Sequence, residues 1–147
     1  MATQTQPLTL NLTRIVKAPA ARVFKAWTDP KQMHNWFGCD QMASLEVKQD
    51  FRVGGDYRVD MHLHDGSINT VYGTFLEIVP DKKVAYTWSN ESQQYPANDT
   101  LVTVEFVGQG DQTVINLTHA RFEDQNSCDG HSHGWSFALD KFSSLFQ

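Results

Sequence analysis

Residues 101–120 read LVTVEFVGQGDQTVINLTHA, two runs of apolar and β-branched residues on either side of a glycine-rich turn. Leu101 to Val107 and Thr113 to about Ala120 both favour extended structure, and Gly108-Gln109-Gly110-Asp111 between them is typical of a tight connection. This stretch therefore predicts a β-hairpin near the C-terminal end of the chain.

The preceding residues continue the same pattern of short strands separated by turn residues. The turns fall at Gly54-Gly55, Asp65-Gly66 and Pro80-Asp81, and a polar loop is expected from Asn90 to Thr100. Together with the hairpin this gives seven strands. The other five are expected at about Leu8–Lys17, Leu45–Phe51, Tyr57–Leu63, Ile68–Val79 and Val84–Ser89.

Helical spacing of apolar residues occurs only near the two ends of the chain. A first helix is expected after Ala18-Pro19 and is broken by Asp29-Pro30, and a second, shorter helix runs from Pro30 to Gly38. The longest helix is C-terminal, with an apolar stripe formed by Trp135, Ala138, Leu139, Phe142, Leu145 and Phe146. Strands in one block with helices at its ends predict an α+β fold, an antiparallel sheet packed against helices on one face.

Length and composition bound the partners of this chain. It has 147 residues, 40% of them hydrophobic, and a formal charge of −5. This suits one domain over residues 8–147, with residues 1–7 as a disordered polar segment. No Lys/Arg run points to nucleic acid, and no apolar run or signal peptide points to a membrane. Two cysteines make no disulfide framework, so we expect a cytoplasmic location. We also expect a monomer or a weak dimer.

Candidate site residues are those whose polar or aromatic side chains fall on the inward faces of strands and helices. On the last strand the period of two places His119 beside Ile115 and Leu117. His131 lies four residues before Trp135 on the C-terminal helix, if that helix already begins there. The remaining candidates are Tyr57, Met61, Tyr86, Trp88 and Leu139. For each, the alternative is a core residue whose polar atoms have protein partners.

Metal and catalytic motifs carry little weight in this sequence. His62 and His64 form a His-x-His pair, but the inward Met61 and Leu63 send both histidines to the solvent side. The stretch from Cys128 to His133 holds one thiol and two imidazoles, which a solvated helix start explains equally well. No nucleophile, metal or nucleotide motif is present, and Cys39 reads as an ordinary loop thiol. We therefore predict no catalytic residue, metal or cofactor.

Short motifs along nearly the whole chain resemble the Hsp90-ATPase-activator homologue family of the START/Bet v 1-like (SRPBCC) superfamily. They are RIVKAP (14–19), VFKAWTDP (23–30), WFG (36–38), FRVGG (51–55), GTFLEIVP (73–80), YTW (86–88), VTVEF (102–106), LTH (117–119) and GW (134–135). The resemblance implies a helix-grip fold, in which a seven-stranded antiparallel sheet curves around the C-terminal helix. It also implies a cavity between sheet and helix that holds apolar molecules in related families.

Three functions remain open at this point. The favoured one is non-enzymatic binding of a small apolar or amphipathic molecule in the cavity. The second is a cyclase or hydrolase that uses a cavity histidine such as His119 as general acid or base. The third is a protein partner. Association with Hsp90 does not follow from the family name, because the eukaryotic co-chaperones carry a separate N-terminal domain for much of that contact. Cys39 also departs from the family, which commonly has proline there.

Overall fold

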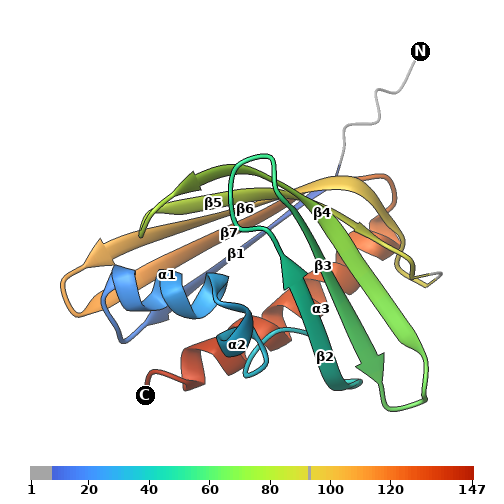
Figure 1. The fold of residues 1–147 in the computed structure, drawn as a ribbon, viewed down its shortest axis with the longest axis horizontal. Coiled ribbons are helices and arrows are strands. Elements are labelled where there is room, and N and C mark those ends of the chain that lie inside the picture. Colours follow the sequence, from blue (N-terminus) through green and yellow to red (C-terminus); the bar gives the residue numbers. More distant parts are fainter. Residues whose placement is uncertain (1–7, 93) are drawn as a thin grey trace.

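The computed structural model of the protein describes residues 8–92 and 94–147, so the prediction for residues 1–7 lies outside it. Within these described residues, three helices and seven strands follow one another (Figure 1). In order they are β1 (Leu8–Val16), α1 (Ala20–Thr28), α2 (Pro30–Met33), β2 (Met42–Gln49), β3 (Asp56–Leu63), β4 (Ile68–Val79), β5 (Lys83–Asn90), β6 (Ala97–Gln109), β7 (Gln112–Phe122) and α3 (Gln125–Ser144).

All seven strands form one antiparallel sheet in the order β1-β7-β6-β5-β4-β3-β2. The sheet curves over α3, and α1 and α2 lie at the end of the sheet where the C-terminus emerges (Figure 1). The predicted α+β helix-grip architecture is thus confirmed. Alternation along the strands buries one face, for instance Ile115, Leu117 and His119 of β7.

The connection between β5 and β6 is shorter than expected. A polar loop from Asn90 to Thr100 was predicted, but Asn90 pairs with Ala97 as the last residues of a longer hairpin. The Asn90 side chain makes this turn: its Oδ1 accepts hydrogen bonds from the backbone N–H groups of Ser92 (3.2 Å) and Ala97 (3.1 Å). Polar composition indicated a loop, whereas a side-chain cap lets both strands continue.

Helix boundaries also differ from the sequence prediction. The regular part of α2 ends at Met33, and the chain continues to Gly38 through turns. Helix α3 begins at Gln125, six residues before His131, because the Asp124 carboxylate caps it by accepting from the Ser127 N–H at 2.7 Å. Gly130 and the polar residues of its first two turns leave no apolar spacing that would mark this start.

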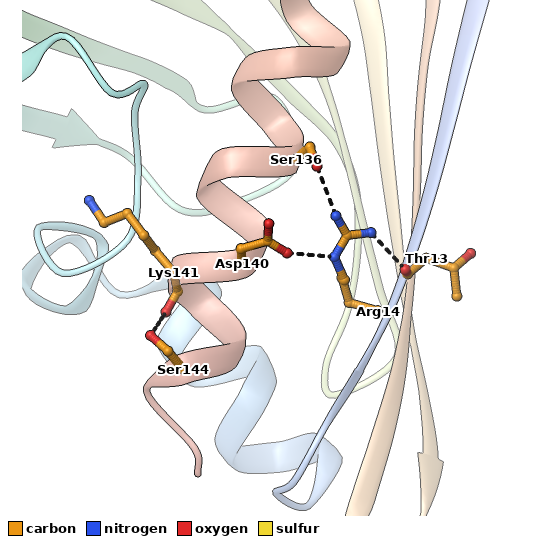
Figure 2. Close-up of polar contacts among 6 residues, drawn as sticks. All are labelled: Thr13, Arg14, Ser136, Asp140, Lys141 and Ser144. Carbon is orange, nitrogen blue, oxygen red and sulfur yellow. Dashed lines mark hydrogen bonds and ion pairs between the residues drawn. The ribbon is translucent and has the colours of Figure 1, made fainter.

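Helix α3 is tied to the edge strand β1 by the Arg14 guanidinium (Figure 2). Its Nε donates to Asp140 at 3.0 Å and one Nη donates to Ser136 at 2.9 Å, while the other reaches the Thr13 carbonyl at 3.0 Å. Asp140 is largely exposed, so this pair orients the helix more than it stabilises the fold.

Aromatic rings from α1, α3 and the turns that follow α2 meet beneath the sheet. The Trp27 indole of α1 is parallel to that of Trp135 on α3, with 6.0 Å between ring centroids and 10° between planes. Trp36, which follows α2, packs on Trp27 at 4.4 Å, and its Nε1 donates to the Ala26 carbonyl at 3.0 Å. This cluster packs α1 and the segment after α2 against α3.

Candidate functional site

An interior cavity of about 30 Å³ lies between the inner faces of β2 to β5 and the segment that runs from α1 to Phe37. That volume is about the share of one water molecule in the liquid. Eight of its thirteen lining residues are aromatic, and among the described residues none of the lining comes from α3. The lining consists of Trp27, Thr28, Met33, Trp36, Phe37, Gln49, Phe51, Tyr57, Val59, Phe75, Val84, Tyr86 and Trp88.

Three of the eight predicted site residues line this cavity, namely Tyr57, Tyr86 and Trp88. The other five are buried in the core outside the lining: Met61, His119, His131, Trp135 and Leu139. A ligand role for these five stays a prediction.

Several lining residues were recognised in the sequence only as core or strand residues. Trp27, Trp36 and Phe37 form apolar helix faces, and these faces point into the cavity. Gln49 was missed, although it follows the inward Val47 with a period of two and so faces the interior. The signal in the sequence was a polar residue, Gln49, at the end of a row of inward-facing apolar residues.

The two tyrosines of the cavity are neutral phenols. The Tyr57 hydroxyl donates to the Thr87 carbonyl at 2.5 Å, and its ring meets that of Tyr86 edge to face with centroids 5.4 Å apart. Burial raises the pKa of Tyr57 well above its usual value, and the neighbouring Tyr86 raises it further. Burial also raises the pKa of Tyr86, and the nearby Trp27 indole opposes this. Both hydroxyls can donate hydrogen bonds, but neither is an available base at neutral pH.

His119 is enclosed by protein partners on both ring nitrogens. Its Nδ1 accepts from the Trp135 indole N–H at 3.0 Å. Its Nε2 lies 2.7 Å from the Thr100 hydroxyl, which itself donates to the Trp88 carbonyl at 2.6 Å. Since that hydroxyl proton is already used, Nε2–H must be the donor, which fixes the neutral tautomer. Burial lowers the pKa of His119 well below its usual value, and the neighbouring His131 lowers it further.

His131 has the opposite tautomer. Its Nδ1–H donates to the Ser127 carbonyl at 2.8 Å, one helical turn earlier. Its Nε2 accepts from the Trp88 indole at 3.2 Å and from the Asn90 amide at 3.0 Å. Burial lowers the pKa of His131, and the Ser127 carbonyl opposes this shift. A proton added at Nε2 would be a third donor facing the Trp88 and Asn90 donors, so both of their hydrogen bonds to His131 would be lost.

The two histidines position Trp88 rather than face the cavity. His131 accepts a hydrogen bond from the Trp88 indole N–H. Thr100, which accepts from His119, donates to the Trp88 backbone carbonyl. Trp88 thus belongs both to the buried polar network and to the cavity lining.

Within residues 8–92 and 94–147 there is no cluster of three or more histidine, cysteine, aspartate or glutamate side chains that could hold a metal ion. His62 lies 3.2 Å from Glu46 on the outer face of the sheet. Cys128 is buried, and burial followed by the Asp129 charge raises the pKa of its thiol. None of the described helices is long and apolar enough to cross a membrane.

The sheet, the long helix that it grips and the aromatic interior define a helix-grip protein of the START/Bet v 1-like class. The sequence profile of the family described as "Activator of Hsp90 ATPase homolog 1-like protein" matches residues 17–147. The chain belongs to this family.

Solved structures extend the comparison over nearly the whole chain. Protein CV1439 from Chromobacterium violaceum is 24% identical, with a TM-score of 0.81 and coverage of 94% of this chain and 96% of that one. An uncharacterized protein from Rhizobium leguminosarum is 26% identical, with a TM-score of 0.78 and coverage of 96% and 95%. DynU16, a protein in the dynemicin biosynthetic locus, shares the fold at 18% identity, with a TM-score of 0.76 and coverage of 93% and 46%. Among curated proteins, none is significantly similar in sequence.

Proposed function

We propose that this protein binds a small, largely apolar molecule whose hydrophobic part enters the cavity, and that it does so without catalysing a reaction. The observation that carries the proposal is the aromatic lining: eight rings converge on one interior space. Ligand pockets typically combine such an apolar lining with a few polar groups, and Tyr86 and Gln49 supply those here.

The ligand-bound form must differ from the structure described above. Small-molecule pockets usually measure about 300–1,000 Å³, whereas this cavity measures about 30 Å³. A ligand of a few hundred daltons therefore has to displace lining side chains. Such ring movements are local, because the backbone hydrogen bonds of the sheet need not change.

The polar network argues against the enzymatic alternative. A general acid or base needs a proton or lone pair that can reach the substrate. Both ring nitrogens of His119 and of His131 are already engaged by protein groups, and burial holds both imidazoles neutral. The cavity tyrosines have raised pKa values, so they do not remove protons from a ligand. The Tyr57 hydroxyl already donates to Thr87, which leaves the Tyr86 hydroxyl to orient a ligand by hydrogen bonding.

The binding proposal is tested by native mass spectrometry and by titration with N-phenyl-1-naphthylamine, a neutral aromatic probe. Trp27, Trp36 and Trp88 line the cavity, so saturable binding should change tryptophan emission. Freshly purified protein should carry a mass of a few hundred daltons that is lost on denaturation. A clean mass together with flat tryptophan emission across a panel of lipids and aromatic compounds would contradict the proposal.

A matched pair of valines locates the probe. Val59 and Val71 face each other across β3 and β4 and are both fully buried, but only Val59 lines the cavity. Val59→Ile should weaken probe binding at least threefold, and Val71→Ile should leave it within 1.5-fold. Equal effects of the two substitutions would mean that the probe binds elsewhere.

A further inference from the structure

A second hollow opens on the surface beside the interior cavity. It measures about 470 Å³, which is within the usual size of a small-molecule site. Its apolar lining includes Ala21, Phe24 and Pro30, and its polar groups include Lys25 and Asp29. The remaining lining residues are Thr28, Gln49, Phe51 and Asp81. We call this hollow the surface groove.

The surface groove and the cavity share three lining residues, Thr28, Gln49 and Phe51. Gln49 bridges the boundary between them, because its Nε2 donates to the Thr28 carbonyl at the end of α1 over 2.7 Å. The Phe51 ring lies between a ring of the groove and a ring of the cavity. Its centroid is 6.3 Å from that of Phe24 and 5.1 Å from that of Phe75. Gln49 and Phe51, together with Thr28, therefore line the boundary between the two spaces.

Both side chains can move while the backbone stays in place. Phe51 is 37% exposed, in the connection between β2 and β3. This connection is fixed to β4 by hydrogen bonds from the Gly54 N–H to the Phe75 carbonyl (2.8 Å) and from the Phe75 N–H to the Gly55 carbonyl (2.9 Å). Rotation of the Phe51 ring toward solvent and release of the Gln49 amide would join groove and cavity without breaking these bonds.

We propose that the surface groove and the cavity are two parts of one site for an amphipathic molecule, with Gln49 and Phe51 as the gate between them. The flat apolar end of the ligand passes the gate and stacks among the cavity rings. Its polar end stays in the groove, within reach of Lys25 and the Gln49 amide. This inference rests on the proposed binding function and adds to it the route of access and the amphipathic class of ligand.

The gate is tested by stopped-flow binding of N-phenyl-1-naphthylamine. Phe51→Ala and Gln49→Ala should each raise the association and dissociation rate constants at least threefold, because both remove a barrier that the ligand crosses in either direction. The matched controls are Val53→Ala, an exposed apolar residue of the same connection, and Gln41→Ala, an exposed glutamine just before β2. Both controls should stay within 1.5-fold of the wild-type rates.

The groove is tested by filling it. Ala21 is exposed on α1 and lines the groove, so Ala21→Trp should slow association at least threefold. Ala43→Trp, at an exposed alanine of β2 outside both linings, should leave the rate unchanged. Near-ultraviolet circular dichroism of each variant shows whether the aromatic core remains packed.

The outcomes separate the two proposals. If the probe binds saturably but neither gate variant changes its rates, the gate is wrong and the binding function stands. If Ala21→Trp leaves association unchanged, the groove does not lie on the ligand's route. If the wild-type protein binds neither this probe nor any compound of the wider panel, the binding function fails and the gate fails with it.

Discussion

The Trp135 indole Nε1 donates a hydrogen bond to Nδ1 of His119 across 3.0 Å, in a place where both residues are buried. This bond joins the middle of α3 to the end of β7. It also sets the tautomer of His119, which then donates to Thr100 through its other nitrogen. One indole N–H thus orders a chain of buried polar groups that ends at the Trp88 carbonyl.

Removing this indole N–H should destabilise the fold. Trp135→Phe leaves Nδ1 of His119 without a donor, so we expect the free energy of unfolding to fall by about 1–3 kcal/mol from that unsatisfied acceptor, in addition to the lost packing. The measurement is urea denaturation of the single variants Trp135→Phe and His119→Leu and of the double variant. A coupling energy of at least about 1 kcal/mol is expected for residues in direct contact. Additive effects would contradict the linkage.

Acid should destabilise the protein through its two buried histidines. Burial lowers the pKa of His119 and of His131, so the unfolded chain binds protons that the folded chain does not. The stabilisation is complete above the unfolded pKa of about 6.5 and is lost as pH falls from there toward the lowered folded values. The slope is at most about 1.4 kcal/mol per pH unit for each histidine. Urea unfolding between pH 8 and pH 5 measures it.

The histidines responsible can be identified by substitution. His131→Gln should lower the overall stability and reduce this pH slope, whereas His64→Gln, in the turn after β3 and outside the network, should keep the wild-type slope. A wild-type slope in His131→Gln would show that other groups carry the acid sensitivity.

The cavity makes one buried valine unusually tolerant of added volume. Val59→Ile places its extra methylene against the cavity, so we expect a change in unfolding free energy within about 0.5 kcal/mol. Val71→Ile forces the same methylene into packed surroundings and should cost about 1–3 kcal/mol. Chemical denaturation of the two variants measures the difference. Equal costs would mean that the cavity is filled or closed in solution.

Two glycines of α3 should respond to alanine in opposite directions. Nothing lies within 4 Å of a Cβ placed on Gly134, so Gly134→Ala should stabilise the protein by up to about 1 kcal/mol through helix propensity. A Cβ on Gly130 would collide with the ring of Tyr95, so Gly130→Ala must displace that ring and should destabilise the protein. Thermal unfolding compares the two. Stabilisation by both substitutions would show that Tyr95 does not pack on the helix.

Local patterns predicted most of the fold and only part of the site. The period of two placed His119 and Tyr57 on the inward face, and Asp29-Pro30 ended α1 as expected. The β5–β6 connection was predicted too long, because the Asn90 side chain caps the turn and lets both strands continue. The start of α3 was left open, because it depends on the Asp124 cap rather than on the apolar pattern.

The inward-facing positions could be predicted from the residues alone, because strand and helix periods are local properties of the chain. It could not determine whether an inward residue meets empty space or a partner. His119 and Trp88 point to the same side of the sheet, yet one is sealed by hydrogen bonds and the other lines the cavity. That difference arises from packing, since the space left over depends on how rings from α1, β5 and α3, far apart in the chain, fill one volume.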